Sequence, residues 1–191
     1  MEIWHLSRFN AWLMMSNLIF LIPVLSFSCR LLLGSITNVL NTAGGHGLIN
    51  DYNRLKKCPV GNAVVGRGFD LPCDWVIHTS TPKYLCKLNF TRRVAYGQMH
   101  ASEEDEAKLR ACYSSVLSIC KEKGIRTIAF PSLGAKAHRY PLAEATKVGM
   151  STILNFLGED DLIDRIVLCT HNGRDSVVVK NVVEECLKGL Q

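Results

Sequence analysis

The sequence lacks the short motifs that mark several large enzyme classes. It contains no G-x-S-x-G, no H-E-x-x-H, no dinucleotide-binding G-x-G-x-x-G and no P-loop G-K-[ST], so none of the corresponding active sites is indicated. None of its 8 cysteines forms a C-x-x-C pair, and their spacing with the histidines matches no compact zinc pattern. We therefore expect no metal ion, no cofactor and mostly buried, reduced thiols.

Charge is scarce at the amino terminus. Glu2, Arg8 and Arg30 are the only charged residues among the first 34, and 15 of the 21 residues between the two arginines are apolar. A membrane span needs about 20 apolar residues. Three interpretations stay open: a signal peptide, a membrane anchor through residues 9–29, and an extension or set of buried strands with no targeting role.

The remaining composition fits a single folded domain. The chain has 191 residues, of which 48% are hydrophobic and 20% charged, which is enough apolar material for a core. The net charge of +5 is too small to indicate nucleic acid by itself. We expect an apolar extension over residues 1–28 and one domain over residues 29–191. The expected location is the cytoplasm, with the membrane or the secretory pathway as the alternative.

Apolar runs alternate with helical patterns from residue 29 onward. Strands are predicted over residues 29–36, 63–65, 75–79, 125–130 and 163–170, and helices over residues 49–57, 103–123, 141–157 and near the carboxyl terminus. This alternation predicts an α/β fold in which a mainly parallel sheet lies between helices.

The clearest predicted helix spans residues 103–123. Its apolar residues fall at helical spacing, with Ser102 as a suitable N-cap, acidic residues in the first turn and Gly124 at the end. The acidic run from Glu103 to Glu106 is interpreted as the helix start rather than as a metal site.

Two loops follow predicted strands and could hold an anionic ligand. Gly44, Gly45 and Gly47 lie in the first loop, where backbone N–H groups can approach a phosphate. The second loop, residues 131–141, contains basic or partly basic side chains at Lys136, His138 and Arg139. The alternative interpretations, without a ligand, are a tight strand-to-helix turn for the first loop and a solvated loop for the second. His78 lies in a predicted strand and is interpreted as a hydrogen-bonded core histidine.

Several segments resemble the macro domain family. KCPVGNAVVGRGFDLPCDWVIHTSTPKY is similar to the family's CPTGEA, GYNLP and VIHTVGP stretches, and RTIAFPSL is similar to its strand ending SIAFP. RYPLAEATKVGMSTILNFL resembles the helix after the family's GYP, and RLLLGSIT resembles its GDIT region. The loop before PLAEAT resembles the macro module of ganglioside-induced differentiation-associated proteins. The resemblance implies a three-layer α/β/α fold with a central mixed, mainly parallel sheet that binds ADP-ribose between two loops.

The chain departs from the family pattern at the implied ligand site. Ser35 stands where the family has the aspartate that recognises adenine, and Asn41 could match the first residue of its asparagine-rich loop. Leu48 follows Gly47, where hydrolases of the family place an aspartate. Both phosphate-cradling glycines of the second loop are replaced, by Lys136 and Arg139.

These features predict a divergent macro domain that binds ADP-ribose or a related nucleotide weakly, without hydrolase activity. A degenerate fold acting as an RNA or protein interaction module and an active mono-ADP-ribosyl hydrolase with Asn41 as its catalytic residue are the alternatives. Expected partners are ADP-ribose or an ADP-ribosylated protein, with RNA or a membrane as further candidates. The candidate ligand-binding residues are Ser35, Asn41, Gly44, Gly45, Gly47, Ser132, Gly134, Ala135, Lys136, Ala137, His138, Arg139 and Asn172.

Overall fold

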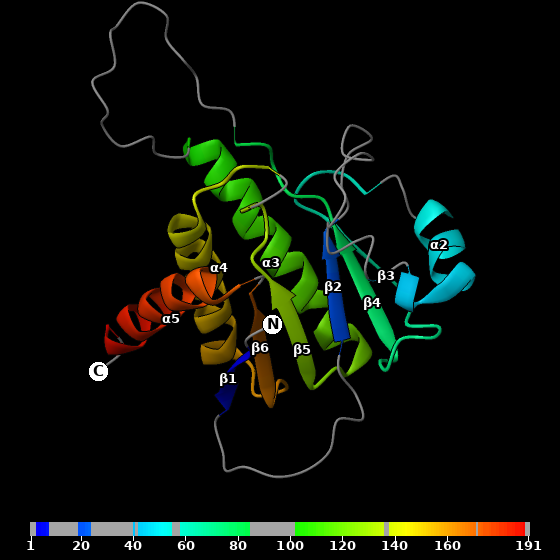
Figure 1. The fold of residues 1–191 in the computed structure, drawn as a ribbon. Coiled ribbons are helices and arrows are strands. Elements are labelled where there is room, and N and C mark those ends of the chain that lie inside the picture. Colours follow the sequence, from blue (N-terminus) through cyan, green and yellow to red (C-terminus); the bar gives the residue numbers. More distant parts are fainter. Residues whose placement is uncertain are drawn as a thin grey trace, which may run out of the picture.

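A six-stranded mixed sheet forms the centre of the molecule (Figure 1). The computed structural model describes residues 3–7, 19–23, 40, 42–54, 58–84, 102–135, 138–170 and 172–189. The strands are β1 (Ile3–Ser7), β2 (Ile19–Pro23), β3 (Ala63–Arg67), β4 (Trp75–Thr79), β5 (Thr127–Pro131) and β6 (Arg165–Cys169).

The strand order is β1-β6-β5-β2-β4-β3. The four inner strands are mutually parallel, and the two edge strands, β1 and β3, pair antiparallel with their neighbours. The predicted mixed, mainly parallel sheet is therefore confirmed.

The apolar amino-terminal segment contributes two strands to this sheet. β1 is an edge strand paired with β6, and β2 is an inner strand paired with both β5 and β4. The boundary expected at residue 28 thus does not coincide with the start of the sheet. Of the open interpretations, strands built into the fold agree with this arrangement, while a targeting role stays a prediction. The strand expected over residues 29–36 lies outside the described residues.

No helix in the described part of the chain is long and apolar enough to cross a membrane. Most of the segment considered as an anchor, residues 9–18 and 24–29, lies outside the described residues.

Helix α3 (Glu103–Lys123) begins and ends where the sequence predicts. The backbone N–H of Asp105 donates to the Ser102 hydroxyl at 3.1 Å, so Ser102 is the N-cap. Gly124 has φ of 67°, the left-handed conformation that commonly ends a helix at glycine. The buried face of α3 consists of Leu109, Cys112, Tyr113, Val116, Leu117 and Cys120.

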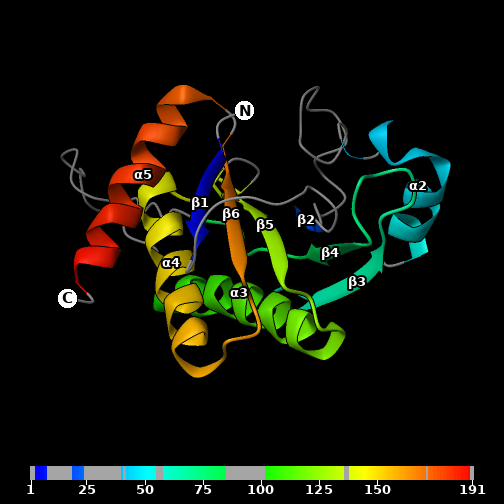
Figure 2. The ribbon, with the colours of Figure 1, turned by 90° about the horizontal axis from the view of Figure 1, so that it is seen from below.

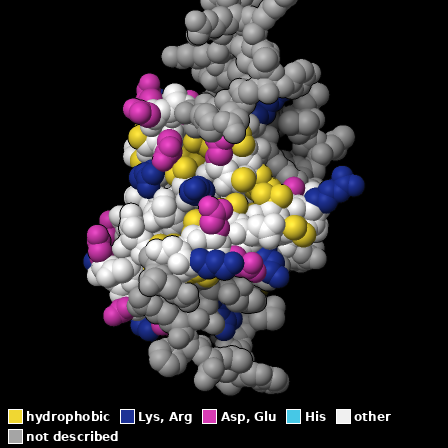
Figure 3. Space-filling model, turned by 90° about the vertical axis from the view of Figure 1, so that its left-hand side faces the viewer, with side chains coloured by type: hydrophobic (Ala, Val, Ile, Leu, Met, Phe, Trp, Pro, Cys, Tyr) yellow, Lys and Arg dark blue, Asp and Glu magenta, His cyan; other side chains and the backbone are white. Residues whose placement is uncertain are grey.

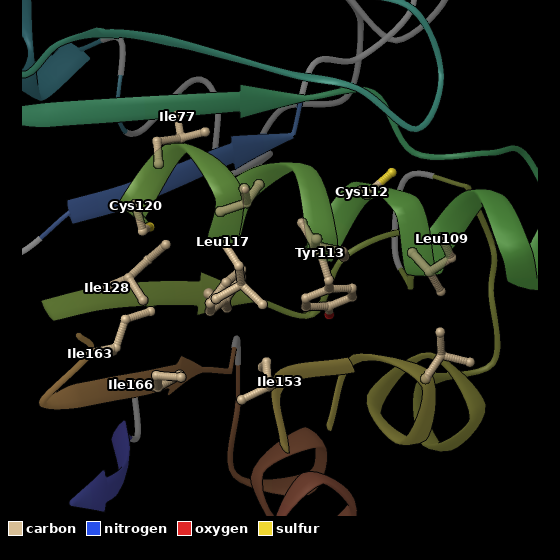
Figure 4. Packing of buried hydrophobic residues seen from close by; sticks show 14 of the residues in the cluster. Ile77, Leu109, Cys112, Tyr113, Leu117, Cys120, Ile128, Ile153, Ile163 and Ile166 are labelled. Atoms are coloured by element: carbon tan, nitrogen blue, oxygen red, sulfur yellow. The ribbon is translucent and has the colours of Figure 1, made fainter. Parts of the chain in front are cut away.

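The helices cover both faces of the sheet (Figures 1 and 2). Adjacent residues of a strand point to opposite faces. Ile77 packs with the buried face of α3, whereas its neighbour Val76 packs with Leu48 of α2 (Gly45–Arg54). Figure 4 shows Tyr113 and Leu117 of α3 lying against the side of the sheet that carries Ile128. The predicted three-layer arrangement is confirmed.

Helix α4 (Leu142–Glu159) packs beside α3, and α5 (Gly173–Lys188) packs beside α4 (Figure 2). Only Ser176 and Val179 of α5 are buried, and Val177 is 58% exposed. Figure 3, which views this side of the molecule, shows hydrophobic side chains scattered among charged ones.

Gly149 marks the close approach of α4 to α3. A Cβ atom placed on it would lie 2.6 Å from Cζ of Tyr113 and 2.7 Å from its hydroxyl oxygen. Tyr113 is buried and its ring packs against Phe130, with centroids 5.3 Å apart, so it cannot easily move away. The contact between these two helices therefore depends on a residue without a side chain.

We expect Gly149→Ala to lower the free energy of unfolding by about 1–2 kcal/mol in urea denaturation, since overpacking outweighs the better helix propensity of alanine. Gly158 lies in the same helix with no atom within 4 Å of an added Cβ. Gly158→Ala is therefore the control and should raise stability by up to about 1 kcal/mol. Effects of the same sign at both positions would contradict the proposed contact.

Candidate functional site

The carboxyl edge of the parallel strands is the candidate ligand site. β4, β5 and β6 end at Thr79, Pro131 and Cys169, so the residues that follow them emerge at one edge of the sheet. Open α/β sheets bind ligands at this edge. Ser132 and Asn172, both predicted as ligand-binding residues, follow β5 and β6 at this edge.

Two glycines of the first predicted loop, Gly45 and Gly47, pack closely against the turn between β3 and β4. Gly45 begins α2 with φ of 69°. Added Cβ atoms would collide with the Asp70 carboxylate at Gly45 and with the Phe69 ring at Gly47. At Gly44 an added Cβ would lie 2.9 Å from Cβ of Leu48. All three glycines thus have close neighbours within the protein, and their role in ligand binding stays a prediction.

This packing also affects the electrostatics of α2. The first turn of α2 contains no acidic residue of its own. Asp70 brings a carboxylate next to Gly45, at the positive end of the helix. An anionic ligand at this helix end would therefore meet a negative charge already in place.

The second loop has a defined backbone around Gly134. Gly134 has φ of 76°, and its carbonyl accepts hydrogen bonds from the N–H groups of His138 and Tyr140, at 3.3 and 3.1 Å. Ala135 donates its N–H to the Ser132 carbonyl at 3.4 Å. Arg139 is exposed and has φ of 59°, a left-handed conformation that is uncommon for a residue with a side chain.

His138 faces the protein interior. A hydrogen bond of 2.7 Å joins its Nδ1 to Oγ1 of Thr81, and both side chains are buried. Burial lowers the pKa of His138, and the nearby charge of Lys83 lowers it further. The side chain of His138 is thus engaged with Thr81 and burial works against its positive charge, while its contact with a ligand stays a prediction.

Asn172 caps helix α5. Its Oδ1 accepts a hydrogen bond from the N–H of Asp175 at 2.8 Å. The amide side chain already has this structural role, and its contact with a ligand stays a prediction. Four further candidates lie outside the described residues: Ser35, Asn41, Lys136 and Ala137.

His78 is the most unusual titratable residue of the described chain. It is fully buried on β4, and neither Nδ1 nor Nε2 has a hydrogen-bond partner. Its ring lies 5.6 Å from that of Tyr52 on α2, measured between centroids. Burial lowers the pKa of His78 to about 4, although the charge of Asp51 acts in the opposite direction. The predicted burial is confirmed, but the predicted hydrogen bonding is wrong.

Two further features of the described residues bear on ligand binding. Among these residues, no three His, Cys, Asp or Glu side chains gather in a way that could hold a metal ion. A small pocket lies between β5, β6 and the helices α3, α4 and α5, and most of its lining is apolar, as at Phe130, Met150, Leu168 and Val179. Such a lining does not suit a diphosphate.

Sequence reasoning missed Thr81, which proves to be the partner of His138. Its place two residues after a predicted strand was the only signal available. Asp51 was also missed: it is nearly buried on α2, pairs with Arg54 at 2.7 Å and acts electrostatically on His78. The Asp51–Arg54 pair has the i, i+3 spacing of a helix, whereas the contacts of Thr81 with His138 and of Asp51 with His78 follow no recognisable spacing in the sequence.

Comparisons with known proteins agree on one family. A family model described as Macro domain matches residues 26–149. ADP-ribose glycohydrolase MACROD2 of Xenopus laevis is 31% identical over 153 residues, which cover 80% of this chain and 34% of that protein. The chain thus spans about a third of the length of this relative.

Solved structures show the same fold. The Oceanobacillus iheyensis macrodomain with ADP superposes with a TM-score of 0.74 at 19% identity, covering 99% of this chain and 100% of that chain. The macro domain of ganglioside induced differentiation associated protein 2 superposes with a TM-score of 0.70 at 20% identity, covering 90% and 84%. At these identities the likeness concerns the fold alone.

Proposed function

Because the chain belongs to the macro domain family, we propose that it binds ADP-ribose or a related nucleotide, free or attached to a modified protein. The observation that carries this proposal is the second loop at the carboxyl edge of the sheet. Arg139 is exposed there in a left-handed conformation, which costs about 1–2 kcal/mol for a residue with a side chain. The Gly134 carbonyl binds the N–H groups on either side of Arg139, and this stabilises the conformation.

An arginine at this place suits a diphosphate. Its guanidinium is permanently charged and can donate two parallel hydrogen bonds to phosphate oxygens. Among relatives, one is named an ADP-ribose glycohydrolase, and a structural neighbour was solved with ADP. Both names concern ligands that contain a diphosphate.

We propose that binding is weak. Ser35 lacks the carboxylate that the family pattern provides for adenine, and the loss of such a charge-assisted bond costs about 1–3 kcal/mol. Asp70 adds negative charge near the start of α2. We expect a dissociation constant of about 10⁻⁴ M for ADP-ribose, equivalent to about −5.5 kcal/mol.

We further propose that the protein does not hydrolyse ADP-ribose linkages. Leu48 stands where hydrolases of the family have an aspartate. Its side chain is fully buried in a cluster with Leu40, Leu71 and Val76. An apolar side chain in this position cannot orient or activate a water molecule.

Calorimetry with ADP-ribose tests the binding proposal. We expect weak but saturable binding to the wild type, and a loss of about tenfold in affinity for Arg139→Ala, since one charge-assisted contact to phosphate disappears. Lys147→Ala removes an exposed cation from α4 and is the matched control, with unchanged affinity expected. Equal affinity of the wild type and Arg139→Ala would overturn the role of Arg139.

Two further outcomes decide between the functions considered. No heat at millimolar ADP-ribose would overturn nucleotide binding, and RNA binding that weakens steeply with salt would then favour an RNA module. Release of ADP-ribose from a mono-ADP-ribosylated protein would overturn the proposal that hydrolysis is absent.

A further inference from the structure

The second loop is joined to the residues that follow β4, a stretch we call the post-β4 segment (residues 81–84). The side chains of Thr81 and His138 share the hydrogen bond of 2.7 Å. The N–H of Tyr84 donates to the His138 carbonyl at 3.0 Å. The rings of Tyr84 and Tyr140 are in contact, with centroids 5.1 Å apart. Three contacts of different kinds thus connect the two segments within a few residues of Arg139.

The Thr81–His138 bond is shielded from water. Thr81 is 2% exposed and His138 is 9% exposed. If either partner lost its polar atom, the other would stay buried without a partner, and this costs more than an ordinary hydrogen bond contributes. The bond is therefore well placed to hold the loop in one conformation.

Both partners depart from the family pattern. The family's VIHTVGP stretch has glycine where this chain has Thr81. The second loop of the family resembles S-T-G-[IV]-[FY]-G-Y-P, which matches residues 134–141 and has phenylalanine or tyrosine where this chain has His138. The two departures lie 57 residues apart in the sequence but bond to each other in the fold. Thr81 bonds to the second loop next to Arg139, which stands in place of a family glycine. The changes at Thr81, His138 and Arg139 therefore form one local arrangement.

We infer that Thr81 and His138 are positioning residues: their hydrogen bond latches the second loop onto the post-β4 segment and thereby fixes the backbone that presents Arg139 to an anionic ligand. This inference rests on the proposed function. His138 then acts on the ligand only through the loop, and its own side chain makes no contact with phosphate.

The test compares variants that remove or keep the bond. Thr81→Val keeps the shape of the side chain and removes the hydroxyl, whereas Thr81→Ser keeps the hydroxyl. His138→Phe removes the nitrogen partner and restores the aromatic residue of the family pattern. Thr152→Val is the control for general destabilisation, because its hydroxyl bonds to the Val148 carbonyl within α4, away from the loop.

Backbone hydrogen exchange measures the latch independently of any ligand. We expect the amides of Tyr84, His138 and Tyr140, which carry the loop's hydrogen bonds, to exchange about tenfold faster in Thr81→Val and His138→Phe. Thr81→Ser and Thr152→Val should exchange at these amides like the wild type. The double variant Thr81→Val/His138→Phe should lose less protection than the two single changes combined, because neither polar atom is then left unpaired.

Calorimetry with ADP-ribose measures the positioning role. We expect affinity to fall several-fold in Thr81→Val and to be retained in Thr81→Ser. Unchanged exchange in Thr81→Val would overturn the latch, whether or not ADP-ribose binds. Faster exchange with unchanged ADP-ribose affinity would overturn the positioning role. A wild type that binds no ADP-ribose would overturn the proposed function and with it the positioning role, while the exchange data would still decide on the latch.

Discussion

A chain that begins at residue 29 should fail to fold. This truncation removes β1 and β2, and β2 is hydrogen-bonded on one side to β4 and on the other to β5. The facing edges of β4 and β5 would then have backbone groups without partners in the middle of the sheet, at about 1–3 kcal/mol each. The combined cost of a few such groups equals the 5–15 kcal/mol by which a typical domain is stable. We therefore expect no cooperative urea transition and no dispersed amide NMR spectrum.

A chain that begins at residue 9 is the matched control. It lacks only β1, an edge strand that pairs with β6 alone, so it should fold with reduced stability. A cooperatively folded chain over residues 29–191 would show that another segment takes the place of β2. The comparison also bears on targeting, because cleavage after Ser28 would remove two strands of the sheet. Amino-terminal sequencing of the native protein shows whether residues 1–28 are cleaved or retained.

Acid should destabilise the protein through His78. Well above pH 6.5 the imidazole is neutral in the folded and the unfolded chain, so it adds no pH dependence there. As the pH falls below 6.5, the unfolded chain binds a proton at this residue, whereas burial keeps the pKa in the folded protein at about 4. The free energy of unfolding should therefore fall between pH 6.5 and pH 4, by up to about 3 kcal/mol from this residue.

Urea denaturation of His78→Leu across this pH range checks the prediction. Leucine has a similar volume and no polar atoms, and it removes two buried nitrogen atoms that have no partner. We expect stability at pH 7 to be equal or higher, and the difference between variant and wild type to grow as the pH falls. His46→Leu, on the exposed side of α2, is the control for the loss of a histidine from the surface. Parallel curves for His78→Leu and the wild type would show that His78 is not the residue that titrates.

The helices and most of the sheet could be predicted from local patterns. The stripe from Leu109 to Cys120, the cap at Ser102 and the stop at Gly124 together defined α3 to the residue. Strand β4 was also predicted with its observed bounds. Such features depend on neighbours within a few positions, and hydrophobic periodicity and capping encode them directly.

The site was predicted less well, because its chemistry depends on contacts between distant segments. His138 appeared as one of three basic groups, but its ring is hydrogen-bonded to Thr81 and burial lowers its pKa. The glycines from Gly44 to Gly47 suggested a phosphate loop, and in the fold Gly45 lies against Asp70 and Gly47 against Phe69. Asn172 is engaged as a helix cap.

The sequence by itself determined the family, the α/β class and the position of α3, because motifs and periodicity are local properties of the chain. The tertiary structure decided the roles of Ile19–Pro23, His78 and His138. An apolar run becomes an inner strand only when β4 and β5 supply partners on both sides, and burial lowers the pKa of a histidine only when the fold removes water from it. Burial and pairing across long sequence distances have no local pattern from which they could be predicted.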